Sequence, residues 1–156
     1  MLATSATLLQ ADGPFLGVKY SPCNTKFLAC SCDSKIFAFN APKQTETKKC
    51  VKDNVWKNPG VNDTCVIKEP NGRIYDFSWY PFTRTNLKES YVFLSTGSGL
   101  PIHLWDANDG SLKASYCGVN EHTQDHMSAI SLSFSTNGNH IVSKPSKALK
   151  VETQLR

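Results

Sequence analysis

Three stretches of this chain repeat one pattern, and the repetition constrains the fold more than any other feature of the sequence. Each stretch has an apolar segment that ends in an aromatic residue, a turn, a second apolar segment, a tight turn and a third segment. The three copies read VKYSPCNTKFLACSCDSKIFAFNA, FSWYPFTRTNLKESYVFLSTGSGLPIHLWDA and LSFSTNGNHIVSKPSKALKVET. Corresponding aromatic positions, Tyr20, Trp79 and Phe134, lie about 55 to 59 residues apart. A period of this kind indicates an architecture built from stacked repeats.

The apolar segments are short, rich in β-branched and aromatic residues, and separated by turn-forming residues. Such segments are typical of β-strands, and no window shows a helical apolar period. The expected strands are Phe15–Ser21, Phe27–Cys32, Ile36–Ala41, Ile74–Tyr80, Tyr91–Gly97, Ile102–Ala107, Ser111–Tyr116, Ile130–Ser135, His140–Ser143 and Ala148–Thr153. Asn108-Asp109-Gly110 and Asn137-Gly138 suit turns that need a positive φ. The sequence therefore predicts an all-β chain.

A radial array of small antiparallel sheets is the architecture that best accommodates these copies. A four-stranded blade needs roughly 40 to 45 residues, and the excess here comes from a polar insertion at residues 42–72. Within it, only TCVIKE resembles a strand. The chain supplies about two to three blades, whereas closed propellers have roughly four to eight. We therefore expect a β-propeller fragment that is not closed.

Composition and charge narrow the function classes only slightly. The net charge is +4, from 17 Lys and Arg against 13 Asp and Glu, which permits an RNA partner without demanding one. The N-terminal apolar run lacks a preceding basic residue and makes a poor signal peptide, and no run approaches the roughly 18 apolar residues of a membrane span. Six cysteines without a CxxC pair are expected to be mostly reduced thiols of an intracellular protein.

The chain contains no nucleophile elbow, phosphate-binding loop or dinucleotide fingerprint, so we expect neither an enzyme nor a cofactor. Cys30 and Cys32 could form a metal or redox pair, but they fit two small core side chains better because no second ligand pair has zinc spacing. His122 and His126 lie four residues apart, yet no helix is expected there to present both to a metal.

Several segments together resemble the telomerase Cajal body protein family of WD-repeat proteins. They are FLGVKYSPCNTKFLACSCDSKIFAFN, IYDFSWYP, YVFLSTGSGLPIHLWDANDGSLKASY and HTQDHMSAISLSFSTNGN. The resemblance covers Phe15–Ala41 and Arg73–Ser143. It divides the chain into an N-terminal extension at 1–14, a WD-repeat segment at 15–143 and a divergent tail at 144–156.

The resemblance implies a nuclear protein of the Cajal body, without catalytic chemistry. It implies that the protein binds small Cajal body RNAs and the telomerase ribonucleoprotein, and that it acts as an adaptor in RNA localisation and telomerase assembly. The rival interpretations are a protein-binding WD-repeat scaffold without direct RNA contact, and a truncated product without function.

The copies depart from the WD-repeat pattern at its structural positions. Asp33 occupies the tight turn where the pattern has an Asp that anchors a buried hydrogen-bond network. Trp105-Asp106 follows the pattern, whereas the first copy has Phe39-Asn40 and the third has Glu152-Thr153 in its place. We expect Trp79, Tyr80 and Phe82 to lie between blades. The buried indole N–H of Trp105 needs an acceptor, for which Ser95 or Thr96 is suitably placed.

The polar insertion carries the strongest candidate RNA contacts. Lysines can contact phosphates, and an exposed aromatic ring can stack on an unpaired base. The candidates are Lys43, Lys48, Lys49, Lys52, Trp56, Lys57 and Arg73. Arg84 and Lys88 could extend this basic surface. The alternative is an ordinary solvated loop between blades.

Overall fold

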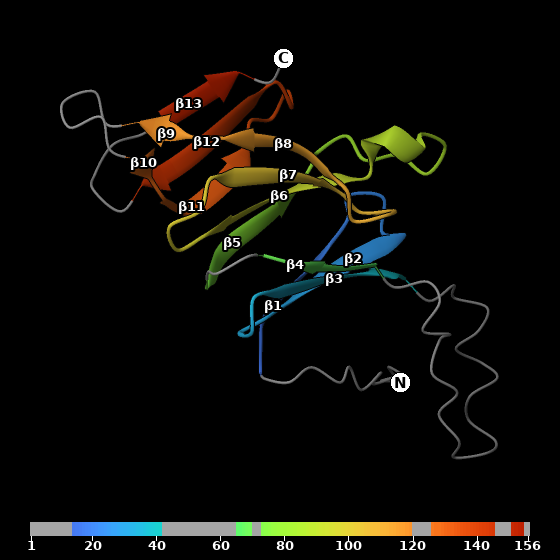
Figure 1. Cartoon of the computed structure of the whole chain (residues 1–156). Coiled ribbons are helices and arrows are strands. Elements are labelled where there is room, and N and C mark those ends of the chain that lie inside the picture. The colour runs from blue at the N-terminus through green and yellow to red at the C-terminus, as the bar shows by residue number, and fades with distance from the viewer. Residues whose placement is uncertain (1–13, 42–64, 70–72, 120–125, 146–150, 155–156) are drawn as a thin grey trace, which may run out of the picture.

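The computed structural model describes residues 14–41, 65–69, 73–119, 126–145 and 151–154. In these ranges the chain forms three antiparallel sheets of three or four strands and one two-stranded pair. The three larger sheets lie one above another as a fan, with the first at the bottom of the view and the third at the top (Figure 1). The prediction of an all-β, unclosed propeller fragment is confirmed.

The three sheets follow the three sequence copies. The first contains β1 (Phe15–Tyr20), β2 (Lys26–Ser31), β3 (Lys35–Asn40) and β4 (Cys65–Lys68) in that order. The second contains β5 (Ile74–Trp79), β6 (Val92–Gly97), β7 (Ile102–Asp106) and β8 (Leu112–Tyr116). The third contains β11 (Ala129–Phe134), β12 (His140–Pro145) and β13 (Val151–Gln154). A two-stranded pair, β9 (Gly118–Val119) and β10 (His126–Met127), precedes the third sheet, and a 3-10 turn, η2 (Lys88–Ser90), precedes β6.

Two strands extend the sheets beyond the segment of clear repeat pattern. The strand-like residues Cys65–Lys68 of the insertion form β4, which pairs with β3 and completes the first sheet. Beyond Ser143, β12 continues to Pro145 and pairs with β13. The insertion therefore interrupts the first blade between its third and fourth strands.

Alternating side chains of each sheet form the cores between blades, because successive residues of a strand point to opposite faces. The core between the first two sheets joins small aliphatic residues of the first sheet to aromatic residues of the second. It contains Leu28, Cys30, Ile36, Ala38, Ile67, Ile74, Phe77, Trp79, Tyr91, Phe93, Trp105 and Ala107. A smaller core joins the second and third sheets through Leu94, Ile102, Ala129, Leu132, Phe134 and Ile141, with Tyr80 packed against it. Trp79 and Tyr80 thus lie between blades as predicted, whereas Phe82 is 43% exposed.

The turns named by the sequence have the expected backbone. Gly110 has φ 77° and Gly138 has φ 70°, both in the left-handed region that glycine adopts without steric cost. Gly138 also admits no side chain, since a Cβ there would lie 2.8 Å from the ring of Tyr80 and 3.1 Å from that of Phe82. The β11–β12 turn therefore packs closely on the second sheet.

We expect Gly138→Ala to lower the free energy of unfolding by about 2 to 4 kcal/mol, which combines left-handed strain with overpacking. Gly99→Ala is the matched control, because Gly99 has φ 71° and a Cβ added there would meet no atom within 4 Å. Its loss should be limited to about 1 to 2 kcal/mol. Urea denaturation of both variants measures the difference. Equal losses of unfolding free energy would show that the contact with Tyr80 does not contribute to stability.

Candidate functional site

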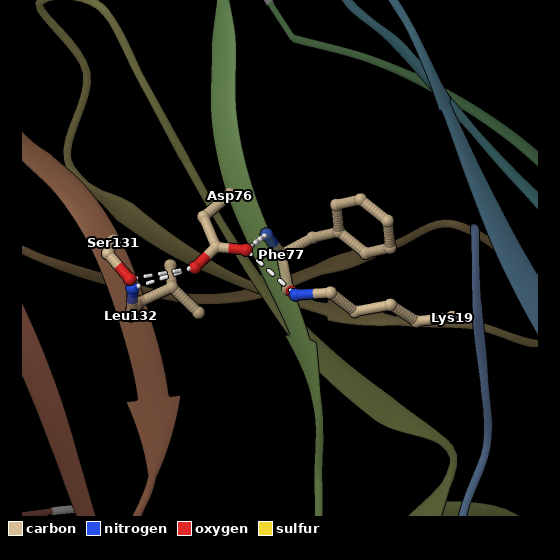
Figure 2. A network of polar contacts seen from close by, with 5 residues as sticks. All are labelled: Lys19, Asp76, Phe77, Ser131 and Leu132. Atoms are coloured by element: carbon tan, nitrogen blue, oxygen red, sulfur yellow. Dashed lines mark hydrogen bonds and ion pairs between the residues drawn. The ribbon is translucent and has the colours of Figure 1, made fainter. Parts of the chain in front are cut away.

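The carboxylate of Asp76 links all three sheets. Asp76 lies in β5, and its Oδ1 accepts hydrogen bonds from the Lys19 ammonium at 2.8 Å and from the Phe77 amide at 2.9 Å. Its Oδ2 accepts from the Ser131 hydroxyl and the Leu132 amide, each at 3.1 Å. Figure 2 shows the carboxylate between Lys19 of β1 on one side and Ser131 of β11 on the other. One side chain therefore ties together the first strands of three blades.

The surroundings of Asp76 favour its charged form. Partial burial disfavours the carboxylate, but the Lys19 ammonium and the Leu132 and Phe77 amides outweigh this cost and hold the pKa of Asp76 below its usual range. The indole of Trp79 adds a second link by donating to the Lys19 carbonyl at 3.0 Å. Thr96 similarly donates to the Ala129 carbonyl at 2.7 Å, so both blade contacts contain hydrogen bonds.

A second polar network surrounds Glu69, which follows β4 and is 2% exposed. Its carboxylate accepts from the Ser95 hydroxyl and from the Trp105 indole at 3.3 Å, and it lies 2.9 Å from Nδ1 of His103. The Trp105 indole also donates to Ser95 at 2.8 Å. Of the two acceptors expected for Trp105, Ser95 is therefore the one it uses.

Sequence reasoning missed Glu69. The only available signal was a single acidic residue directly after the strand-like CVIK, in a segment read as an insertion. In the structure, this residue joins the last strand of the first blade to the second and third strands of the next.

The remaining repeat positions make local contacts. Asp106 accepts from the amide and side chain of Asn108 at 2.8 and 2.9 Å and pairs with Lys113 at 3.1 Å, which closes the β7–β8 turn. Asp33 accepts from the Ser31 hydroxyl and pairs with Lys35 at 2.6 Å. These partners, with Lys35 the larger influence, lower the pKa of Asp33. Phe39 and Asn40 end β3, and the Phe39 ring stacks on those of Phe27 and Phe37.

Most of the predicted RNA contacts, Lys43, Lys48, Lys49, Lys52, Trp56 and Lys57, lie outside the described residues. The ends of their segment are nevertheless placed, since it follows β3 at Ala41, whose amide donates to the Thr25 carbonyl, and precedes β4. We call this end of the sheets the insertion edge. It also carries the β1–β2 turn, the β5–β6 loop with Arg84 and Lys88, the β7–β8 turn and the β11–β12 turn.

Arg73 lies at the opposite edge. Its carbonyl accepts from the Ser98 amide in the β6–β7 turn, and the length of β5, about 20 Å, separates it from the insertion edge. The structure therefore brings Arg84 and Lys88 to the edge where the insertion begins and ends, but not Arg73.

The candidate metal ligands do not assemble in the described ranges. Cys30 is buried, and desolvation is the main cause that raises the pKa of its thiol to about 12. Among the described residues, no three His, Cys, Asp or Glu side chains gather where they could hold a metal ion. His122 lies outside these residues, and of His126 only the backbone in β10 is described. No helix in the described part of the chain is long and apolar enough to cross a membrane.

We expect Asp76→Asn to lower the free energy of unfolding at pH 7 by about 1 to 3 kcal/mol, because the amide cannot pair with Lys19 and presents a donor to other donors. In the folded protein the carboxyl pKa lies below its ordinary value of about 4. The charged carboxylate therefore contributes its full stabilisation at pH values above that ordinary value. It is lost as the pH falls through the folded pKa. The difference in the free energy of unfolding between the wild type and the variant should therefore become smaller in acid, as measured by denaturation from pH 7 to pH 3.

Lys19→Gln and the double variant complete a thermodynamic cycle for this ion pair. A coupling free energy near zero would contradict the role assigned to the Asp76 charge. So would a stability difference between the wild type and Asp76→Asn that does not change with pH.

We expect Glu69→Ala to cost about 2 to 4 kcal/mol, because it leaves the buried groups of Ser95, His103 and Trp105 short of an acceptor. Glu69→Gln keeps one acceptor oxygen and should cost less. Tryptophan fluorescence during urea unfolding measures both variants, and equal stability of the alanine variant and the wild type would refute this account.

The chain is similar in sequence to telomerase Cajal body proteins of several animals. No protein-family model matches it. It is 40% identical over 80 residues to the Telomerase Cajal body protein 1 homolog of Drosophila melanogaster, which covers 51% of this chain and 14% of that protein. It is 29% identical over 126 residues to Telomerase Cajal body protein 1 of Mus musculus, and 26% over 148 residues to that of Homo sapiens. These alignments cover 80% and 94% of this chain and 22% and 26% of the relatives.

The fold has a solved counterpart in the C-terminal WD40 domain of Sif2, with a TM-score of 0.63 and 13% sequence identity. The match covers 96% of this chain and 36% of that one, so the chain corresponds to about a third of a WD40 domain. It spans about a quarter or less of the curated relatives' length. The chain therefore has the WD40 fold and, as its motifs predicted, is related to a stretch of the telomerase Cajal body proteins.

Proposed function

We propose that this chain is an RNA-binding segment of a WD-repeat adaptor that serves Cajal body RNA localisation and telomerase assembly. The proposed partners are small Cajal body RNAs and the telomerase ribonucleoprotein, and the proposed location is the nucleus. The observation that supports RNA contact is the position of the described residues on either side of the lysine-rich insertion. Both ends of this segment emerge at the insertion edge, beside the loop that bears Arg84 and Lys88.

The chemistry of this edge suits single-stranded RNA. Residues 43–57 of the insertion supply five lysines against two acidic residues, Glu46 and Asp53, together with Trp56. Lysines neutralise phosphates and release counterions, while an indole offers a stacking surface for any base. Arg84 and Lys88 are exposed on the adjoining β5–β6 loop, which would extend the basic surface across the second blade.

The Asp76 and Glu69 networks contribute by rigidity and not by RNA contact. They join the first blade to the second and thereby fix Ala41 and Cys65, which flank the basic segment, relative to the β5–β6 loop. A fixed spacing between these points lowers the entropy lost on binding. No catalytic step is part of this proposal.

A protein-binding scaffold without RNA contact is the second candidate. Phe82 and Leu87 of the β5–β6 loop are 43% and 49% exposed at the same edge, which favours a protein partner with an apolar anchor. The two candidates differ in their response to salt, because RNA binding releases the counterions condensed on the phosphates, whereas binding through an apolar anchor depends little on salt.

We expect the affinity for a small Cajal body RNA to fall steeply with salt, with a slope of log K against log salt that changes by about 0.7 for each phosphate contact removed. Replacing Lys48, Lys49 and Lys52 by Gln should weaken binding and flatten this slope. Fluorescence anisotropy at several salt concentrations, with an unrelated RNA of equal length, measures both effects.

Arg73→Gln is the matched control, since it removes one positive charge at the opposite edge. It should leave the slope unchanged. Binding that is independent of salt, or equally tight for unrelated RNA, would contradict the proposed RNA function and favour the scaffold. A loss from Arg73→Gln as large as that from the insertion variant would show that the RNA does not bind at the insertion edge.

A further inference from the structure

The ring of Phe82 lies at the insertion edge, where the second blade meets the third. It packs edge-to-face on the ring of Tyr80, with the two centroids 5.9 Å apart. A Cβ added to Gly138 would lie 3.1 Å from the Phe82 ring, so the backbone of the β11–β12 turn contacts the ring as well. These contacts hold the ring in place, yet Phe82 is 43% exposed. Because described blades flank the second blade on both sides, this exposure does not come from an end of the chain.

The β5–β6 loop that carries this ring is fixed by its own hydrogen bonds. The Thr83 hydroxyl bonds to the carbonyl oxygens of Tyr80 and Ser90, at 2.7 and 3.1 Å. The Ser90 hydroxyl accepts from the Arg84 amide at 2.8 Å and donates to the Leu87 carbonyl at 2.6 Å. Thr83 and Ser90 are each 5% exposed, so water does not compete for these bonds. A loop that is ordered in advance loses little entropy when it binds a ligand.

The surroundings of the ring are polar and basic. Arg84, two residues further along the loop, and Lys88 of η2 are exposed, and they face one acidic residue of the loop, Glu89. Asn137 and Asn139 are exposed on the β11–β12 turn, which contacts the ring from the third blade. Cations bind phosphates, and side-chain amides offer both a donor and an acceptor to the edge of a base.

Exposure of an aromatic ring alone is equally consistent with an apolar anchor of a protein partner, but the surroundings of this ring are not. An aliphatic anchor would bury amides and cations without giving them partners, which costs free energy. An unpaired nucleobase has an apolar face for the ring, polar edges for the amides and a phosphate for the cations. The surroundings of Phe82 therefore favour a nucleobase.

We propose that Phe82 is a stacking platform for one unpaired base of a bound RNA, with Arg84 and Lys88 beside the phosphates and the β11–β12 turn beside the base edge. This inference rests on the RNA-binding function proposed above. It extends the bound strand from the insertion of the first blade to the junction of the second blade with the third. Stacking is available to every base, so the platform supplies affinity and fixes the path of the strand.

Phe82→Leu tests the ring itself, because leucine keeps an apolar side chain but offers no flat surface for stacking. The affinity for a small Cajal body RNA should fall at least about fivefold, the effect of roughly 1 kcal/mol. The slope of log K against log salt should stay the same, since no charge is removed. Phe82→Tyr keeps the ring and should bind like the wild type. Fluorescence anisotropy at several salt concentrations measures these variants.

Tyr75→Leu is the matched control, because Tyr75 is also 43% exposed but lies near the start of β5, at the opposite edge. Leu87→Ala is a second control, which removes an exposed apolar side chain from the same loop. Both variants should bind the RNA like the wild type. Thermal melts identify any variant that fails to fold. Ultraviolet crosslinking of the wild type to the RNA needs no variant, and mass spectrometry should find an adduct on the peptide that contains Phe82.

The outcomes separate this inference from the function on which it rests. Binding that depends on the insertion lysines but not on Phe82→Leu would overturn the stacking platform and leave the RNA function intact. Equal losses from Phe82→Leu and Leu87→Ala would also overturn it, because they would indicate an apolar contact in place of stacking. Adducts found only on other peptides would place the bases elsewhere. A wild type that binds no RNA would overturn both proposals and leave the loop to a protein partner.

Discussion

The carboxylate of Asp76 is the interaction on which the arrangement of the three blades depends. Each blade begins with a strand that carries a bulge at the same place, between Phe15 and Gly17, between Ile74 and Asp76, and between Ala129 and Ser131. A bulge re-aims the side chain beside it. Only the middle strand has a carboxylate there, and its two oxygens reach in opposite directions to the neighbouring strands.

The residues at the two flanking bulges suit this central group. Gly17 brings no side chain to compete for Asp76, and even a Cβ there would meet the Phe77 ring at 3.6 Å, an ordinary van der Waals contact. Ser131 supplies a hydroxyl donor to Asp76. The three positions are thus equivalent in the repeat but differ in chemistry, and a single charge between them holds three sheets without leaving an unpaired ion.

Glu69 plays a comparable part between the first two blades, where it follows β4 and contacts β6 and β7. Placing a carboxylate in a buried position is costly unless donors surround it, and Ser95, Trp105 and His103 do so. Both networks act between blades, where hydrophobic packing alone fixes distance but not orientation.

The sequence by itself determined the repeat, the strands and their turns, because alternation and turn chemistry are local properties of neighbouring residues. It also identified the indole of Trp105 as needing an acceptor and the lysine-rich insertion as the most basic segment. Only the tertiary structure decided that Glu69 and Asp76 are the groups that join the blades. It likewise separated Arg73 from the insertion edge. These outcomes depend on which strands become neighbours, and residues as distant as Lys19, Asp76 and Ser131 meet only once the sheets have stacked.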